Sequence, residues 1–285
     1  MAKGLKVLRA MTTVRRLFLV TVLVASAARA DWRSVAPGVD YQEYRGDTYD
    51  VHVTRINVSS DQIRIVVTSE TEKGLKVSDY AKKVNAIAAV NGDYFDDHFN
   101  PVGYTIGPCG PWANMKDLKR EIVLQIANQH GFLRRRTELA DTPTDPVDAA
   151  ISGWPTIVAE CRALGSKELP GSDAFTRSPH PRTALGISKD GTLLYFVVAD
   201  GRRTGVPGLT LAELADFMVD KLSVCSAMNV DGGGSAAMWV ADKIVNRPSD
   251  GVERGVGDHI AVILRRDYNG CEPQPQQKTS SSAQR

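Results

Sequence analysis

Three consecutive glycines, Gly232, Gly233 and Gly234, constrain the fold of this chain more than any other feature of its sequence. They follow an apolar segment, residues 227–230, whose pattern predicts a buried strand. Glycine loses more conformational freedom on folding than any other residue, so three are costly in a turn that one could make. They permit backbone angles closed to other residues and let N–H groups converge on an anion. With Asp231 before them, they indicate either a phosphate site beside a carboxylate or a structural tight turn.

Two common glycine motifs do not fit this segment. A nucleotide P-loop needs a lysine shortly after its glycines, and none follows at that spacing. A nucleophile elbow needs one glycine two residues before its serine and another two residues after it. Gly233 satisfies the first requirement for Ser235, but Ala237 occupies the second position.

Most of the segments with a regular pattern are short, β-patterned and joined by turns. The predicted strands are residues 50–58, 63–68, 86–90, 121–127, 131–134, 183–188, 193–199, 227–230, 238–246 (two strands) and 260–265. Two helices are expected, one capped by Ser78 and one opened by the capping box of Thr210 and Glu213. Residues 31–49 are expected to be irregular and residues 97–116 to form a long loop. Because strands outnumber helices and cluster as hairpins, we expect an α+β fold with mixed or antiparallel sheets and flanking helices.

The first thirty residues have the composition of an export signal. Basic residues precede an apolar run, residues 17–28, and Ala28 and Ala30 occupy the positions that a signal peptidase recognises. The run is short for a membrane span, which needs about 20 residues. We therefore expect residues 1–30 to be removed, residues 31–270 to form a single domain in the periplasm or outside the cell, and residues 271–285 to be disordered.

Charge and cysteine content narrow the class of protein further. The formal net charge is +2, and the sequence has no basic stripe of the kind that binds nucleic acid. Four cysteines lie outside the leader, and an even number in an exported chain favours disulfides. Their wide spacing does not fit a zinc site. The sequence does not choose among the possible pairings of Cys109, Cys161, Cys225 and Cys271.

Polar side chains recur where predicted strands begin or end, and these are Arg182, Asp200, Arg202, Asn91 and Asp93. A guanidinium is the side chain whose fork best matches two phosphate oxygens, which suits Arg182 to an anion. A lone arginine is more often part of a surface salt bridge, and an Asp-Gly turn is common in any sheet. Because these side chains all stand at strand ends, we expect them to line one rim of a sheet beside Asp231.

A series of short segments in a fixed order resembles the phosphodiester glycosidase family over roughly residues 85–264. They are VNGDYF from Val90, ISGWP from Ile151, PRTALG from Pro181, ADGR from Ala199, NVDGGGS from Asn229 and VNRPSD from Val245. The blocks DGGGS and PRT are specific for this family when they occur together, whereas neither is specific for it alone. Asp93 and Trp154 stand where the family often has glycine, so we expect them to affect the choice of substrate, with Trp154 narrowing the pocket or stacking on a sugar.

The resemblance implies a single catalytic domain that hydrolyses the anomeric C–O bond of a sugar-1-phosphodiester. Asp231 is then the principal catalytic carboxylate, as nucleophile or as base on water, and Asp200 is the second. Residues expected to bind the sugar or its phosphate are Asn91, Asp93, Arg182, Thr183, Arg202, Asn229, Gly232, Gly233, Gly234, Ser235 and Asn246. Phosphate leaves readily, so its stabilisation by the glycine amides and Arg182 is expected to matter more than its protonation.

Several alternatives stay open at this point. Carboxylates near a phosphate can also hold a divalent cation, although the spacing requires no cofactor. A phosphodiesterase that cuts the P–O bond and a non-catalytic binder of envelope glycans would use similar residues. For an exported chain, envelope polymers with sugar-phosphate linkages are the expected target class.

Overall fold

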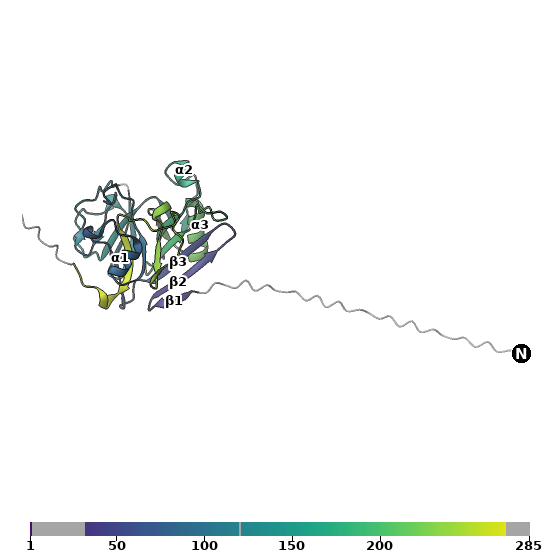
Figure 1. Cartoon of the computed structure of the whole chain (residues 1–285), viewed down its shortest axis with the longest axis horizontal. Coiled ribbons are helices and arrows are strands. Elements are labelled where there is room, and N and C mark those ends of the chain that lie inside the picture. Colours follow the sequence, from purple (N-terminus) through teal and green to yellow (C-terminus); the bar gives the residue numbers. More distant parts are fainter. Residues whose placement is uncertain (2–31, 120, 272–285) are drawn as a thin grey trace, which may run out of the picture.

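Three antiparallel sheets contain most of the regular secondary structure in a computed structural model that describes residues 1, 32–119 and 121–271 (Figure 1). The large sheet has the strand order β1 (Arg33–Ala36), β2 (Val39–Arg45), β3 (Asp50–Asn57), β14 (Leu193–Ala199), β13 (Arg182–Ile187), β15 (Ser226–Asn229), β11 (Thr156–Ala159) and β12 (Arg162–Ala163). The β5 sheet has the order β17 (Lys243–Ile244), β16 (Met238–Val240), β5 (Ala86–Asn91), β18 (His259–Leu264) and β4 (Ile63–Val67). The hairpin sheet has the order β7 (Gly110–Pro111), β6 (Ile106–Gly107), β10 (Ala149–Gly153), β8 (Ile122–Ala127) and β9 (His130–Arg135).

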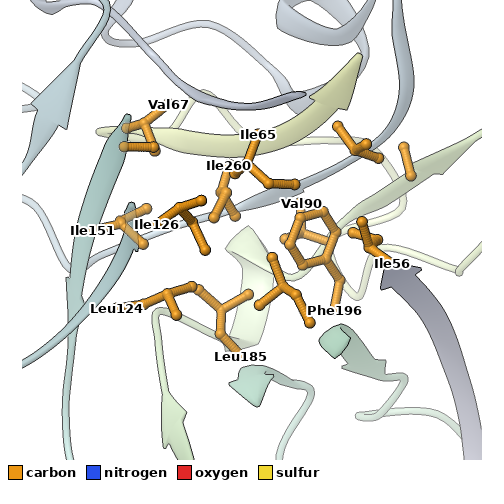
Figure 2. Close-up of a cluster of buried hydrophobic side chains, with 14 of the residues drawn as sticks. Ile56, Ile65, Val67, Val90, Leu124, Ile126, Ile151, Leu185, Phe196 and Ile260 are labelled. Carbon is orange, nitrogen blue, oxygen red and sulfur yellow. The ribbon is translucent and has the colours of Figure 1, made fainter. Parts of the chain in front are cut away.

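All three sheets contribute side chains to one hydrophobic core (Figure 2). Ile56, Leu185 and Phe196 come from the large sheet and are fully buried. Val90 and Ile260 come from the β5 sheet, and the hairpin sheet adds its own aliphatic residues. β13 is buried along its whole length and β14 along nearly all of it, so residues 184–187 and 193–199 are apolar without alternation.

Two helices cover the outer faces of two of the sheets. Helix α3 (Leu211–Leu222) packs against the outer face of the large sheet, and helix α1 (Val77–Lys83) packs against the β5 sheet. The capping box of α3 is formed as predicted, because Thr210 Oγ1 accepts the Glu213 N–H at 3.2 Å and the Glu213 carboxylate accepts the Thr210 N–H at 2.8 Å. A third helix, α2 (Asp173–Thr176), is a single turn in a loop.

The antiparallel hairpins expected from the sequence are confirmed, and every strand pair within the described ranges is antiparallel. The fold is mostly β, with fewer helical residues than the expected α+β class implies. Most of the predicted irregular entry is not irregular, since β1 and β2 form within residues 32–49 at the exposed edge of the large sheet, where few residues are buried. The predicted loop at residues 97–116 contains the short strands β6 and β7.

The start of α1 also differs from its prediction. Lys76 is the N-cap residue and Ser78 lies inside the helix. The Ser78 backbone N–H donates to the Glu253 carboxylate at 2.9 Å, so a distant acidic side chain satisfies this helix terminus in place of a local cap.

Two disulfides confirm the prediction from the even number of cysteines. Cys109 pairs with Cys271, and Cys161 pairs with Cys225. The predicted leader and nearly all of the predicted tail lie outside the described residues. Among the residues that are described, no helix has the length and apolar character needed to cross a membrane.

Replacing Phe196 by alanine is expected to lower the free energy of unfolding by about 3–5 kcal/mol, because it leaves a cavity where the three sheets meet. Urea unfolding followed by circular dichroism measures this change. The control is Phe132→Ala, at a ring on β9 that is 37% exposed, for which a change below about 1 kcal/mol is expected. Equal losses in the two variants would contradict the assignment of Phe196 to the shared core.

Candidate functional site

The polar strand ends meet at a rim that two sheets share. In the large sheet, Arg182 at the start of β13 lies opposite Ala199, which precedes Asp200, and Ala184 lies opposite Asn229 at the end of β15. In the β5 sheet, Asn91 at the end of β5 lies opposite His259. Antiparallel pairing therefore places the end of one strand beside the start of its neighbour and gathers these residues. The expected rim exists, but it spans two sheets instead of one.

Asn91 joins the two sheets through both ends of its buried side-chain amide. Its Nδ2 donates to the backbone oxygen of Asp231 at 2.6 Å, and its Oδ1 accepts the Thr183 hydroxyl at 2.8 Å. The Asp231 N–H donates to the Gly92 oxygen at 2.9 Å. Asn91 and Thr183 thus fix the backbone on which Asp231 is mounted.

The Asp231 carboxyl lies at the partly exposed start of the glycine turn. Its Oδ1 accepts the N–H of Gly232 at 2.9 Å. Burial raises the pKa of this carboxyl, while the Ser235 hydroxyl, the Gly232 N–H and the charge of Arg254 oppose the rise. Ser235 Oγ is near the carboxyl, but among the described residues it meets no partner at hydrogen-bond geometry. Buried hydroxyls normally have partners, so an orphan beside a carboxyl is typical of a functional site.

A Cβ at each glycine of the turn would meet a different neighbour. A Cβ at Gly232 would lie 2.8 Å from the backbone oxygen of Pro181. Gly233 has a φ of +59°, and a Cβ there would lie 3.0 Å from Arg202 Nη2. A Cβ at Gly234 would collide with the ion pair of Asp250 and Arg254. The glycines therefore let two guanidinium groups from separate segments approach the backbone closely.

The glycine amides do not form the convergent cradle that the sequence suggested. The N–H of Gly232 donates to its neighbour Asp231, and the N–H of Gly233 donates to the Pro181 oxygen at 2.9 Å. Two of the three glycine amides thus hold the turn in shape, and the positive groups facing solvent at the turn are side chains.

Arg202 and Arg254 provide positive charge at this turn. Arg202 is exposed, and no carboxylate among the described residues pairs with its guanidinium. Arg254 is half exposed and pairs with Asp250 at 2.5 Å. Neither guanidinium is shielded from solvent, so both can contact an anion that sits over the glycines.

Arg182 lies beside the turn, but its guanidinium is engaged inside the protein. Its Nε donates to the Leu209 oxygen at 3.0 Å, and its Nη2 donates to the oxygens of Phe175 at 2.5 Å and Ser178 at 3.1 Å. Burial lowers the pKa of Arg182 to about 10, and the nearby charge of Arg202 adds to this effect.

A second set of contacts joins aromatic residues to Asn229, two residues before Asp231, and sequence analysis did not identify Tyr94 or Phe175. Asn229 Nδ2 donates to the Tyr94 hydroxyl at 2.6 Å, and this hydroxyl donates to the Trp154 oxygen at 2.8 Å. Asn229 Oδ1 is buried without a partner among the described residues. The Phe175 ring stacks on Trp154. Tyr94 stands inside the VNGDYF segment, but nothing in the sequence marks Phe175 or Arg254.

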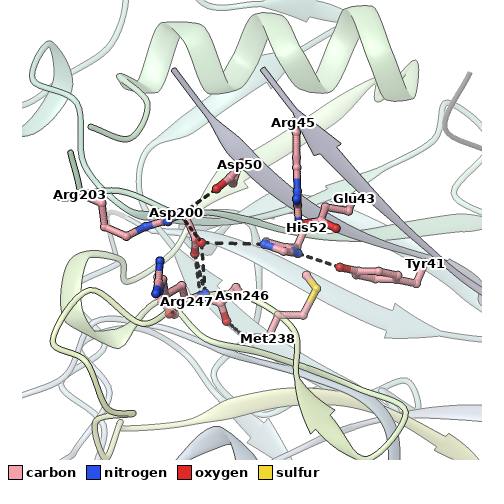
Figure 3. Close-up of polar contacts among 11 residues, drawn as sticks. Tyr41, Glu43, Arg45, Asp50, His52, Asp200, Arg203, Met238, Asn246 and Arg247 are labelled. Atoms are coloured by element: carbon pink, nitrogen blue, oxygen red, sulfur yellow. Dashed lines mark hydrogen bonds and ion pairs between the residues drawn. The ribbon is translucent and has the colours of Figure 1, made fainter. Parts of the chain in front are cut away.

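Asp200 is the centre of a buried polar network (Figure 3). Its carboxylate accepts the Arg247 N–H at 2.9 Å, Asn246 Nδ2 at 3.2 Å and Arg203 Nη2 at 2.9 Å. His52 Nε2 lies 4.0 Å from Asp200. Asn246 Oδ1 accepts the Met238 N–H at 2.8 Å, so Asn246 is bonded at both ends. The structure thus engages Asp200 and Asn246 with neighbouring segments of the chain.

Asp93 and Asp258 form a buried pair beneath the site. The Asp93 N–H donates to Asp258 Oδ1 at 2.7 Å, and Asp93 Oδ2 accepts the Gly103 N–H at 2.7 Å. Thr105 donates to Asp258 Oδ2 at 2.9 Å. Burial raises the pKa of both carboxyls, to about 6 for Asp258, and the charge of Asp258 raises that of Asp93 further. Within the described ranges, no group of three or more His, Cys, Asp or Glu side chains is placed to hold a metal ion.

A cavity of about 610 Å³ lies away from Asp231. Its walls include Glu70, Tyr80, Trp112 and Tyr268, and none of the predicted site residues lines it. The candidate site is therefore at the rim of the sheets and not in this cavity.

Asp258 is expected to make the protein less stable as pH rises from about 4 to about 6. Its folded pKa of about 6 exceeds the ordinary value of 3.8, so the folded protein binds the extra proton, and this advantage is lost as pH passes the folded pKa. The contribution is roughly 3 kcal/mol. Burial lowers the pKa of His259 to about 3, which has the opposite effect between about pH 3 and 6.5.

Comparison with Asp258→Asn isolates the carboxyl from the histidine. Urea unfolding at pH 4 and pH 7 measures how much more stable the wild-type protein is than the variant. This difference should be larger at pH 4, by roughly 3 kcal/mol. The same difference at both pH values would contradict a raised pKa for Asp258.

Comparison with known proteins finds curated relatives that match about a third of the chain. Human N-acetylglucosamine-1-phosphodiester alpha-N-acetylglucosaminidase is 42% identical over 85 residues, which are 30% of this chain and 16% of that protein. An uncharacterized SPbeta prophage-derived protein of Bacillus subtilis is 37% identical over 88 residues, 31% of this chain and 13% of that protein. The chain therefore covers less than a fifth of the length of these curated relatives.

Solved structures share the fold over more of the chain. The catalytic domain of the zebrafish N-acetylglucosamine-1-phosphodiester alpha-N-acetylglucosaminidase has a TM-score of 0.67 at 19% identity and covers 83% of this chain and 87% of its own. A putative exported protein of Burkholderia pseudomallei has a TM-score of 0.55 at 18% identity, with 75% and 74% covered. The sequence profile of the phosphodiester glycosidase family matches residues 84–263, which include the whole rim from Asn91 to His259. The chain belongs to the phosphodiester glycosidase family.

Proposed function

We propose that this protein hydrolyses the anomeric C–O bond of a sugar-1-phosphodiester, with Asp231 as its catalytic carboxylate. The observation that carries the proposal is the placement of Asp231 at a partly exposed glycine turn that two arginines, Arg202 and Arg254, approach from different segments. An anion at the arginines then lies next to a carboxylate, which is the charge arrangement that a glycosyl phosphate requires.

In the proposed reaction, the phosphodiester binds over Gly233 and Gly234, between Arg202 and Arg254. Asp231 faces the anomeric carbon and either attacks it, forming a glycosyl ester that water then hydrolyses, or takes the proton from an attacking water. The bond from the anomeric carbon to the phosphate oxygen breaks, and its electron pair leaves with a phosphate monoester. Because the arginines stabilise the departing charge, no strong proton donor is required.

The other predicted site residues have two kinds of role in this proposal. Asn91 and Thr183 hold the Asp231 backbone and do not contact the sugar. Asp200 and Asn246 position the segment that leads from β16 and β17 toward Arg254, since their polar groups are already bonded. Asn229, two residues before Asp231, has a buried Oδ1 with no partner among the described residues, and this acceptor is assigned to a sugar hydroxyl.

An extracellular location agrees with this function. Two disulfides suit an oxidising compartment, and one structural neighbour is described as a putative exported protein. We propose that residues 1–30 direct export and that envelope or extracellular polymers with sugar-phosphate linkages are the substrate class.

Asp231→Asn is expected to lower kcat by at least about 10²-fold, because the amide cannot act as a nucleophile or base but keeps the acceptor for the Gly232 N–H. Release of sugar from a methyl ester of a sugar-1-phosphate measures the rate, with and without EDTA so that a cation requirement is visible. The matched control is Asp242→Asn at the exposed turn between β16 and β17, which should keep the wild-type rate. A rate within a few-fold of wild type for Asp231→Asn would remove Asp231 from its role.

Hydrolysis in ¹⁸O-labelled water distinguishes this reaction from cleavage of the P–O bond. Attack at the anomeric carbon places the label on the sugar, whereas attack at phosphorus places it on the phosphate. Label on the phosphate would assign the protein to the phosphodiesterases, and binding of the ester without turnover would make it a glycan-binding protein.

Arg254→Gln is expected to move the acidic limb of the pH profile of kcat/KM to higher pH. The Arg254 cation lowers the pKa of Asp231, so its removal lets burial raise that pKa further, and the active carboxylate forms only at higher pH. Rates measured from pH 3 to 8 locate the limb. The control Arg266→Gln removes a guanidinium that is 81% exposed and should leave the limb unmoved. A shift to lower pH in Arg254→Gln would contradict the assignment.

A further inference from the structure

We propose that Trp154 and Phe175 form an aromatic wall against which the sugar ring of the substrate packs, and that Arg182 positions this wall instead of binding the phosphate. The inference rests on the proposed function, because it assigns the sugar side of the same site. It names a ligand class, a pyranose with an exposed C–H face.

The aromatic wall consists of two stacked rings that are only partly buried. The ring centroids of Trp154 and Phe175 are 5.4 Å apart and their planes are inclined by 22°. Gly171 packs at the edge of both rings, where a Cβ would lie 3.1 Å from Trp154 and 3.2 Å from Phe175. Aromatic rings offer a large apolar contact area with little conformational freedom, which suits the C–H face of a sugar ring.

Hydrogen bonds connect the aromatic wall to the catalytic turn. The Trp154 N–H donates to the Asn229 oxygen at 2.7 Å, and the Trp154 oxygen accepts the Tyr94 hydroxyl at 2.8 Å and Asn229 Nδ2 at 3.2 Å. Asn229 stands two residues before Asp231, and the charge of Asp231 also raises the pKa of Tyr94. The wall is therefore fixed relative to the catalytic carboxylate.

Arg182 fixes the other half of the wall. Its guanidinium donates to the backbone oxygens of Phe175 and Ser178 and lies 5.3 Å from the centre of the Phe175 ring. It also donates to the Leu209 oxygen, so one buried side chain joins the loop that carries Phe175 to the start of β13 and the entry to α3. Two of its nitrogens are thus committed to carbonyl groups, which a phosphate would have to displace.

The two sides of Asp231 differ in chemistry, and this difference assigns the substrate groups. Arg202 and Arg254 lie against the glycines that follow Asp231. Asn229, Tyr94 and the aromatic wall are connected to the strand that precedes it. With the phosphate at the arginines and the anomeric carbon at Asp231, the sugar ring extends toward Trp154 and Phe175.

The experiment separates the two halves of the substrate with two kinds of product-like probe. N-acetylglucosamine, glucose and galactose test the sugar side, and methyl phosphate tests the phosphate side. Each probe is titrated into the full chain by calorimetry and used as an inhibitor of hydrolysis of the corresponding sugar-1-phosphate methyl ester. The variants are Trp154→Ala, Phe175→Ala, Arg182→Lys, Arg182→Gln and Arg202→Gln, with Phe132→Ala as the exposed aromatic control, and thermal melting checks the folding of each.

Trp154→Ala and Phe175→Ala are expected to weaken binding of the monosaccharide, and to raise KM for the ester, by about 10-fold each. Their kcat and their affinity for methyl phosphate should stay within about threefold of wild type. Arg182→Lys and Arg182→Gln should show this same pattern, because they release Phe175. Arg202→Gln should show the reverse, with weaker methyl phosphate binding and unchanged monosaccharide binding.

Three results would overturn the proposal. Loss of methyl phosphate affinity in a folded Arg182 variant, with monosaccharide binding unchanged, would show that Arg182 binds the phosphate. Wild-type affinity for the monosaccharide in both folded aromatic variants would show that the sugar does not pack on the aromatic wall. The absence of monosaccharide binding by the wild-type protein would show the same. Failure of the ester to turn over would refute the proposed function alone, because calorimetry tests the wall without catalysis.

Discussion

The side-chain amide of Asn91 is the interaction on which the candidate site depends. It bonds at once to the backbone after β15 and, through the Thr183 hydroxyl, to β13, while Asn91 itself ends β5. Two sheets that pack only through apolar side chains could slide by fractions of an ångström, whereas a buried amide with both ends paired admits one register. The bond therefore fixes Asp231, which follows β15 of the large sheet, relative to Arg254, which precedes β18 of the β5 sheet.

The glycine turn shows how a sheet edge can bring cations close to a carboxylate. A Cβ at Gly233 would contact Arg202, and a Cβ at Gly234 would contact the pair of Asp250 and Arg254. The glycines lose conformational freedom on folding, and their lack of a side chain lets the guanidinium groups approach. The sequence suggested that backbone amides themselves would hold the anion. In the structure, Gly232 and Gly233 use those amides to shape the turn, and the positive charge comes from side chains distant in the sequence.

Most strands and the α3 capping box could be predicted because their signals are local: apolar runs, hairpin turns and the Thr210 to Glu213 spacing. The edge strands β1 and β2 could not, since few of their residues are buried and an apolar pattern is weak there. Asp231 and the rim could be anticipated from motifs at strand ends. Phe175 and Arg254 could not, because each reaches the site from a loop whose position depends on contacts distant in the sequence.

The environment of the arginines separates groups that hold the protein together from groups that can meet a ligand. Arg182 is buried and bonds to carbonyl oxygens, with its charge unpaired by any carboxylate within the described part of the chain. A cation so placed is costly unless the surrounding dipoles stabilise it. Arg202 stays in solvent, so an incoming phosphate has little to displace there. Proximity to the glycine turn alone would give both arginines one role, and only their partners distinguish them.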